Sequence, residues 1–319
     1  MEKTKKLNLL GLILLLLATL AWGSSFLILK QTIEQVPGFF VISIRFFAAG
    51  IIMGVIFFKR VKTSLNKKSL THGVILGVTV ALAYLVQTWG LKFTTPSHNA
   101  FMTATYCVMC PFLCWLLLKR KPKSYNVLSA ILCIIGIGVI SFYGNAEHGT
   151  NVLLGDIITL GCAVFYSLQI IFIESFQEKG TDPILLLVTE FFCVGIVLGI
   201  SWAVFELPYS DMSAVTNISL DQWLSIGYLT LVCTLFAQMA QIYGQRYTTA
   251  NQSAIILTME AVFGTAFSVI FGDESLSVLI IVGFALVFVS MMISELRLDP
   301  LKLFKRKNQS KTSNPPNSD

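Results

Sequence analysis

Apolar residues fill long stretches of this 319-residue chain, and polar residues gather between them. A helix needs about 20 apolar residues to cross a hydrocarbon core roughly 30 Å thick. Because the stretches do not alternate between apolar and polar positions, they predict helices rather than barrel strands. The pattern therefore predicts an all-α integral membrane protein with ten transmembrane helices. The stretches are residues 7–29, 36–58, 70–91, 97–118, 125–143, 153–174, 183–205, 221–244, 249–271 and 276–294.

Composition agrees with a membrane solvent. Only 13% of the residues are charged, about half the share in soluble domains. The first stretch follows three lysines, as a signal peptide would, but it is too long for the apolar region of one. We interpret it as the first span.

The positions of the basic residues predict the orientation. If the N-terminus is cytoplasmic, 20 of the 23 Lys and Arg residues fall on the cytoplasmic side or in the tail. Lys30 and Lys92 fall on the other side, and Arg45 lies within a stretch. By the positive-inside rule, both termini are cytoplasmic and the protein is a multi-pass protein of the cytoplasmic (plasma) membrane. The net charge of +6 thus follows from orientation and does not indicate nucleic-acid binding.

The two halves of the chain resemble each other. At an offset of 154, residues 73–108 are identical to residues 227–262 at nine of 36 positions. At an offset of 145, "RFFAAGIIMG" (45–54) resembles "EFFCVGIVLG" (190–199). We expect one five-helix repeat over 7–143, a second over 153–294, and a disordered basic and polar cytoplasmic tail over 295–319.

Five helices is an odd number, so the second repeat enters the membrane from the opposite side. Inverted repeats are typical of secondary transporters with alternating access. Helix starts are also marked, by Pro96 behind Thr95, by Pro183 behind Asp182, and by a capping box at Ser219 and Gln222.

Several motifs are similar to a known family, and their order spans the chain. "WGSSF" (22–26), "RFFAAG" (45–50), "GLKFTTPSHNAFMTATYCVMCPFLCWLLLKRKP" (90–122) and "LTMEAVFGTAFSVIFGDESLS" (257–277) resemble the EamA-type branch of the drug/metabolite transporter (DMT) superfamily. The resemblance implies a central cavity lined by spans 1, 3, 4, 6, 8 and 9. Where the family often has proline after the glutamate, this chain has Ala261. We therefore expect the ninth span to be straighter than the fourth, which keeps Pro111.

Glu260 is the only charged residue in the stretch 249–271. It lies about 16 Å along the helix from Thr249, near the membrane midplane. A charge there costs roughly 2.5–3.5 kcal/mol, so it tends to face a cavity or a partner. Its repeat equivalent is Tyr106, and we expect the two to face each other across the cavity. Coupling to protons and recognition of a cationic group would both suit this glutamate, whereas a hydrogen bond between helices is the structural alternative.

Other polar residues fit a lined pocket. Gln87 and Gln241 are repeat equivalents, as are Tyr84 and Gln238. Tyr84 and Gln87 are three residues apart and so share a helix face, and the same holds for Gln238 and Gln241. Candidate substrate-binding or coupling residues are therefore Glu260, Tyr106, Gln87, Gln241, Tyr84, Gln238, Trp22 and Gln169. Further polar or aromatic positions are Ser24, Ser25, Trp89, Tyr166 and Ser167, although helices in lipid also use such residues for packing.

Two more charges lie within stretches. Arg45 and Glu190 are repeat equivalents of opposite sign. Their predicted depths differ by roughly 8 Å, so an ion pair would need both side chains extended. We expect a structural role in helix packing for each.

No catalytic set is visible, and no nucleotide-binding loop occurs. Cys107, Cys110 and Cys114 have a metal-like spacing without nearby histidine or acid, so we interpret them as small apolar residues and expect no metal and no cofactor. The sequence predicts a secondary active transporter, not an enzyme, that exports a small organic metabolite or drug-like solute with proton or ion coupling. The alternatives are a lipid-head-group flippase component or membrane enzyme, and a non-transporting receptor or scaffold.

Overall fold

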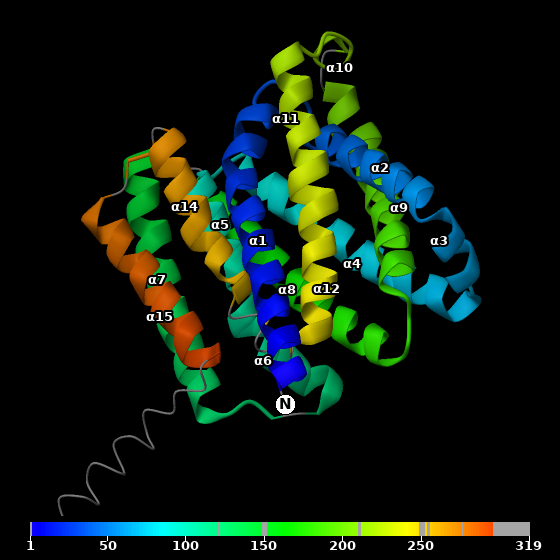
Figure 1. The fold of residues 1–319 in the computed structure, drawn as a ribbon. Helices are drawn as coiled ribbons and strands as arrows, with labels where there is room; N and C mark the ends of the chain where they lie inside the picture. The colour runs from blue at the N-terminus through cyan, green and yellow to red at the C-terminus, as the bar shows by residue number, and fades with distance from the viewer. Residues whose placement is uncertain are drawn as a thin grey trace, which may run out of the picture.

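The computed structural model describes residues 2–119, 121–148, 152–209, 212–248, 253, 256–272, 274–275 and 277–295. Within these residues every regular element is helical (Figure 1). The α-helices are α1 (Glu2–Ile33), α2 (Gly38–Ile56), α3 (Phe58–Ser64), α4 (Lys67–Leu91), α5 (Pro96–Ala104), α6 (Tyr106–Leu118), α7 (Ser124–His148), α8 (Val152–Glu178), α9 (Pro183–Ser201), α10 (Ser213–Thr216), α11 (Leu220–Thr230), α12 (Ala237–Tyr247), α14 (Met259–Phe271) and α15 (Val278–Glu295). Two π-helical segments, η1 (Trp202–Glu206) and η3 (Leu231–Phe236), and the 3₁₀ segment η2 (Leu207–Tyr209) continue neighbouring helices.

Seven described helical stretches are long and apolar enough to cross a membrane: Leu9–Ile33, Gly38–Ile56, Lys67–Leu91, Pro96–Leu117, Val152–Glu178, Pro183–Tyr209 and Leu220–Tyr247. Three shorter apolar helices, Ser124–Ile140, Met259–Phe271 and Val278–Ile293, fall in the remaining predicted stretches. The all-helical membrane class is confirmed. Most of the predicted tail (296–319) and residues 249–252 of the ninth stretch lie outside the described residues.

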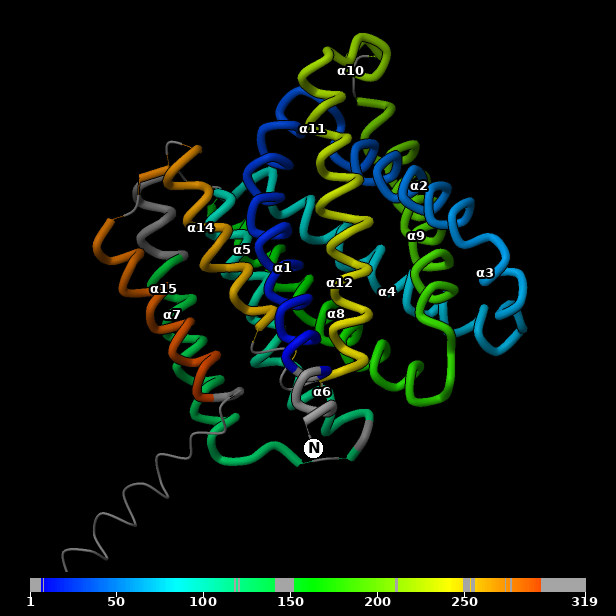
Figure 2. The backbone as a smooth tube through the Cα atoms, in the orientation of Figure 1, coloured from blue at the N-terminus to red at the C-terminus, as the bar shows by residue number. Residues whose placement is uncertain are grey.

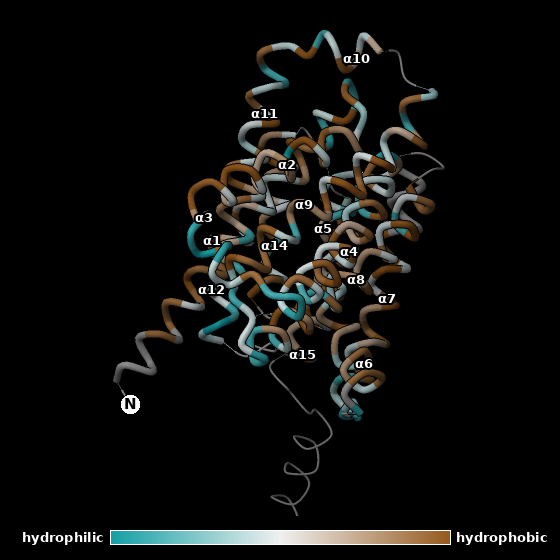
Figure 3. The backbone as a smooth tube through the Cα atoms, turned by 90° about the vertical axis from the view of Figure 1, so that its right-hand side faces the viewer, coloured by the Kyte–Doolittle hydropathy of each residue, from teal (hydrophilic) through white to brown (hydrophobic). Residues whose placement is uncertain are grey.

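The outer surface of the helices is apolar. Large hydrophobic side chains such as Val55, Leu116, Ile134 and Ile270 are exposed. Figure 3 shows hydrophobic residues along most of the helices, with hydrophilic residues near helix ends, such as the end of α6. Exposed apolar area of this extent is what a lipid-facing surface requires.

Helices far apart in sequence lie side by side (Figures 1 and 2). Helix α7 packs along α15 at one edge, and α2 packs along α9 at the other. Between them, α4 packs on α8 and α9, while α1 packs on α12 and α14. Each half of the chain thus supplies a helix to each of these pairs.

Two helix crossings depend on glycine. A Cβ atom on Gly90 of α4 would lie 2.9 Å from the carbonyl oxygen of Gly155 on α8. A Cβ atom on Gly244 of α12 would lie 3.0 Å from the carbonyl oxygen of Gly11 on α1. Small residues let helix backbones approach closely in lipid, so these four glycines set the spacing of α4 and α8 and of α1 and α12.

The predicted helix starts are confirmed. The Thr95 side chain accepts a hydrogen bond from His98 N at 3.3 Å, and that of Asp182 accepts one from Ile184 N at 2.9 Å. Ser219 and Gln222 form the capping box ahead of α11. These side chains satisfy backbone N–H groups that have no partner within the helix.

The fourth predicted span is interrupted at Thr105, between α5 and α6, and Pro111 lies inside α6. The Thr105 hydroxyl donates to the Met102 carbonyl at 2.6 Å, a local bond that competes with regular helix geometry. The ninth span has a turn at Thr258, directly before α14. Both spans thus turn at a threonine. The expectation that the ninth span is straighter than the fourth stays a prediction, because residues 249–252 and 254–255 of the ninth stretch lie outside the described residues.

Candidate functional site

A central cavity lies among α1, α2, α4, α5, α6, α8, α12 and α14. All eight candidate residues line it, and so each repeat pair is present in full: Tyr106/Glu260, Gln87/Gln241 and Tyr84/Gln238. The lining also includes Ser25, Arg45, Asn99, Thr103 and Tyr166, with Phe26, Leu29, Ile170 and Leu257 as apolar wall. The structure places the candidates together, while their roles stay predictions.

The glutamine side chains of the cavity wall hydrogen-bond to hydroxyl groups and to other glutamines. Gln87 on α4 donates to the Thr103 hydroxyl at 2.9 Å and accepts from the Tyr166 hydroxyl at 2.9 Å. Gln169 on α8 donates to Gln241 at 3.4 Å and to Gln238 at 3.5 Å. Since both partners of Gln169 lie on α12, these contacts link α8 to α12.

Glu260 lies in the first turn of α14 and is 5% exposed. Its Oε1 atom has no hydrogen-bond partner among the described residues. The Tyr106 phenol at the start of α6 lies close enough to interact with the carboxyl group. The predicted juxtaposition of an acid and a phenol at equivalent positions is present in the cavity.

Arg45 on α2 lines the cavity as well and is 1% exposed. It is held by η3: Nε donates to the Thr234 hydroxyl, and Nη2 donates to the Cys233 carbonyl at 3.4 Å. The guanidinium carbon lies 5.4 Å from the centre of the Tyr84 ring. Nη1 is buried and has no hydrogen-bond partner among the described residues, so one N–H edge of this cation lacks an acceptor there.

Glu190 on α9 is fully buried but does not line the cavity. Neither of its carboxyl oxygens has a hydrogen-bond partner among the described residues. The two repeat-equivalent charges are therefore not paired: Arg45 bonds to η3, and Glu190 lies apart from it.

Trp22 on α1 contacts the same π-helical segment. Its indole Nε1 donates to the Cys233 carbonyl at 3.0 Å, so this oxygen accepts from both Trp22 and Arg45. Three positions that fitted a pocket by sequence do not line it: the Ser24 hydroxyl bonds to Tyr228 at 2.8 Å, that of Ser167 donates to the Tyr106 carbonyl at 2.7 Å, and Trp89 is 51% exposed. Helix packing accounts for the two serines.

Sequence patterns did not predict Asn99 and Thr103 on α5 as lining residues, nor the buried contact between His98 and Asp156. Both ionisable residues are visible in the sequence, but their contact is not. Asp156 is a carboxylate inside the stretch 153–174, and His98 lies two residues past the helix start at Pro96. Both lie near predicted span ends, where charged residues are ordinary. In the described residues, no group of three His, Cys, Asp or Glu could hold a metal ion.

The model of the EamA-like transporter family matches residues 9–142 and 153–295. The chain belongs to the EamA-like transporter family. The resemblance to the EamA-type branch of the DMT superfamily is thus confirmed, and the multi-pass plasma-membrane location follows from family and helices together. This EamA protein is a membrane transporter.

Relatives agree with this placement. An "Uncharacterized transporter" from Archaeoglobus fulgidus is 30% identical over 284 residues, covering 89% of this chain and 85% of the relative. "Uncharacterized transporter YetK" from Bacillus subtilis is 22% identical over 280 residues, covering 86% of this chain and 83% of the relative. A solved structure titled "Crystal structure of protein" shares the fold, with a TM-score of 0.65 at 15% identity over 92% of this chain and 98% of that one.

Proposed function

We propose that this EamA-family transporter is a secondary carrier with ten transmembrane helices in two inverted repeats, 7–143 and 153–294, and with both termini cytoplasmic. The tail 295–319 extends into the cytoplasm. The carrier moves a small organic solute by alternating access, and the family resemblance favours export. Charge placement supports the orientation, since the basic residues gather on one side.

Contacts exchanged between the halves support the repeat. Gly90 and Gly244 are repeat equivalents, and each packs against a glycine on the first long helix of the other half, Gly155 and Gly11. A twofold relation between the halves predicts such reciprocal contacts. A relation of this kind is what rocking of two repeats about a central site requires.

The central cavity carries the proposal, because it combines charges of both signs with aromatic rings. From Arg45, contacts run to the Tyr84 ring, then to Tyr166 at 5.9 Å between ring centres. From Tyr166 they run to Tyr106 at 6.4 Å, and Tyr106 lies near Glu260. Three contacting rings thus line the same cavity as a guanidinium with an unpaired nitrogen and a carboxyl with an unpaired oxygen.

Buried polar atoms without partners are rare in folded proteins, and at such a site they favour a ligand that supplies the partner. The cavity therefore suits a small solute with an anionic group for Arg45, a cationic group for Glu260 and a ring for the tyrosines. Glu260 would accept either the cationic group or a proton, which provides a route to proton coupling.

Counterflow into proteoliposomes tests this with a matched charge series: phenylalanine, phenethylamine and 3-phenylpropionate. We expect phenylalanine to exchange best. Glu260→Gln removes the advantage of phenylalanine over 3-phenylpropionate, and Arg45→Gln removes its advantage over phenethylamine. One hydrogen-bonded ionic contact corresponds to roughly tenfold in KM, since about 1.4 kcal/mol is a factor of ten.

Glu190→Gln is the matched control, because Glu190 is an equally buried acid outside the cavity. Its selectivity should equal that of the unmodified protein. Equal transport of all three solutes in every variant would contradict the assignment of the two charges. Absence of counterflow for the whole series would refute this solute class, and absence of any flux with a broader metabolite panel would favour a receptor or scaffold.

A further inference from the structure

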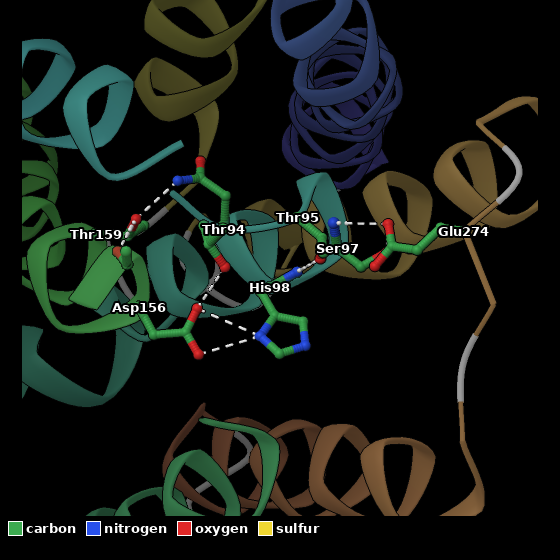
Figure 4. Close-up of polar contacts among 9 residues, drawn as sticks. Thr94, Thr95, Ser97, His98, Asp156, Thr159 and Glu274 are labelled. Carbon is green, nitrogen blue, oxygen red and sulfur yellow. Dashed lines mark hydrogen bonds and ion pairs between the residues drawn. The ribbon is translucent and has the colours of Figure 1, made fainter. Parts of the chain in front are cut away.

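A buried histidine–carboxylate pair lies outside the cavity, at one end of α5 and α8. His98 Nδ1 lies 3.1 Å from Oδ2 and 3.3 Å from Oδ1 of Asp156. The Thr94 hydroxyl donates to Oδ1 of Asp156 at 2.6 Å. Figure 4 shows the imidazole and the threonine hydroxyl directed at the same carboxylate. His98 is fully buried, and Asp156 is 1% exposed.

We propose that the His98–Asp156 pair is a proton-binding site, loaded from the outer side, that couples the proton gradient to transport. This inference rests on the proposed function and assigns a second ionisable site to it. Without a bound proton the pair carries a net charge of −1, and with one it is neutral. Uptake of one proton from the outer solution and its release on the inner side complete the exchange.

Burial makes a net charge on the pair unfavourable. An ionised group inside a membrane-spanning bundle is unfavourable unless a partner compensates for it. Protonation neutralises the pair, and the Thr94 hydroxyl stabilises the carboxylate while the proton is exchanged. In this conformation water does not reach either side chain, so exchange requires α5 and α8 to move apart.

Two charged side chains, Lys30 and Glu274, hydrogen-bond to residues near the pair. Lys30 on α1 donates to the carbonyl oxygens of Leu91 at 2.8 Å and Thr94 at 3.1 Å. Glu274, after α14, accepts from the Ser97 hydroxyl at 2.9 Å. Both charged groups thus contact residues that lie next to the pair in the sequence or in space. The ring of Phe284 from α15 covers the imidazole, and the ammonium group of Lys92 is directed to Glu206 instead.

The pair adjoins the cavity lining. Asn99, the residue after His98, lines the cavity and donates to the Thr159 hydroxyl at 2.8 Å and to the Gln87 carbonyl at 3.3 Å. Thr159 lies one turn along α8 from Asp156, on the same helix face. Movement of α5 against α8 therefore displaces both the proton site and the cavity wall.

The two halves differ at this place. Asp156 follows Gly155, which packs on Gly90. In the reciprocal contact, Gly11 packs on Gly244, and the residue that follows Gly11 is Leu12. The ionisable pair is thus present at one end of the pseudosymmetric fold, as a site that loads protons from one side of the membrane requires.

Proteoliposomes with and without a pH gradient test the proposal, with labelled phenylalanine as the solute and trapped pyranine as the reporter of proton movement. The membrane potential is clamped. One coupled proton allows up to about tenfold accumulation for each pH unit. We expect His98→Gln and Asp156→Asn to retain counterflow within about twofold of the unmodified protein, because neither residue lines the cavity. Both should lose gradient-driven accumulation and solute-dependent proton movement.

His72→Gln is the matched control, because His72 Nδ1 bonds to the neutral hydroxyl of Thr181 at 2.7 Å. It should keep gradient-driven accumulation. If His98→Gln and Asp156→Asn exchange solute and still accumulate it with a gradient, the proton site is refuted while the carrier function stands. If both variants also lose counterflow, a structural staple between α5 and α8 replaces the proposal. If the unmodified protein shows no counterflow with phenylalanine or with any solute of the broader metabolite panel, the proposed function itself has failed, and the proton site fails with it.

Discussion

The rings of Phe46 on α2 and Phe191 on α9 pack edge to face, with 5.7 Å between their centres and 75° between their planes. These residues are repeat equivalents at an offset of 145. Their neighbours Phe47 and Phe192, also equivalents, pack in the same way at 6.4 Å. In the proposed arrangement of two repeats about a twofold axis, a residue contacts its own equivalent only beside that axis. The α2–α9 contact therefore supports an axis between these helices.

Loss of either ring at this contact should destabilise the protein. Both side chains are fully buried, and truncation of a buried phenylalanine costs about 3–5 kcal/mol. We expect Phe46→Ala and Phe191→Ala each to lower the unfolding midpoint in detergent, with a coupling of roughly 0.5–1.5 kcal/mol in the double-mutant cycle. Phe58→Ala, at an exposed ring, should change little. Full additivity of the two core substitutions would contradict a direct ring contact.

Gly90→Ala should disrupt the crossing of α4 and α8. The new Cβ atom would meet the carbonyl oxygen of Gly155 and the backbone nitrogen of Thr159, both at 2.9 Å. Backbone atoms cannot rotate away, so we expect a cost of about 1–3 kcal/mol. A Cβ atom on Gly54 meets nothing within 4 Å, so Gly54→Ala should stabilise α2 by up to about 1 kcal/mol. Thermal unfolding should show a lower midpoint for Gly90→Ala and a higher one for Gly54→Ala. Equal midpoints of the two variants would refute the close crossing.

The Glu206 carboxylate hydrogen-bonds to the N-terminus of α2. Its carboxylate accepts from the backbone nitrogens of Gly38 at 3.1 Å and Phe39 at 2.8 Å, and it pairs with Lys92 at 2.5 Å. A negative charge at a helix N-terminus is favourable, and hydrogen bonds to charged groups contribute roughly 1.5–3 kcal/mol. Glu206→Gln should therefore lower stability by about 1–3 kcal/mol in chemical unfolding.

The control for that substitution is Glu34→Gln, at an exposed glutamate, with an expected change within about 0.5 kcal/mol. Equal effects at the two positions would mean that the contacts of Glu206 contribute nothing to stability.

At the other end of the helices, Asp182 combines a cap with an ion pair. It caps α9 and contacts Arg60 at 2.9 Å. Removing the cap with Asp182→Ala should cost about 1 kcal/mol, whereas Asp182→Ser keeps it. Arg60 is 41% exposed, so Arg60→Gln should cost less than about 1 kcal/mol.

The loss of stability caused by Arg60→Gln should also be independent of pH near neutrality. The hydrogen bond with Asp182 raises the pKa of the Arg60 guanidinium above its ordinary value. A group whose pKa is raised by folding stabilises the fold fully at any pH below its pKa in the unfolded chain. This stabilisation is lost only as the pH rises through its pKa in the folded protein. The effect of Arg60→Gln should thus be constant between about pH 6 and 9. Unfolding at several pH values checks this, and an effect that vanishes inside that range would contradict it.

The sequence by itself determined the membrane class, the helical spans, several caps and the eight polar residues that meet in the cavity. Apolar length and charge placement are local properties, because each helix must satisfy its own backbone hydrogen bonds in lipid. Repeat equivalence added which positions face each other, as Tyr106 and Glu260 do. None of these inferences required knowledge of how the helices cross.

Only the tertiary structure decided which buried charges meet. Arg45 and Glu190 are equivalent in sequence, yet Arg45 bonds to η3 and lines the cavity while Glu190 does not. His98 and Asp156 are 58 residues apart, and nothing in either local sequence indicates the other. Such contacts depend on the angle and spacing of helix crossings. Those are set by close approaches such as Gly90 to Gly155, which a one-dimensional pattern does not contain.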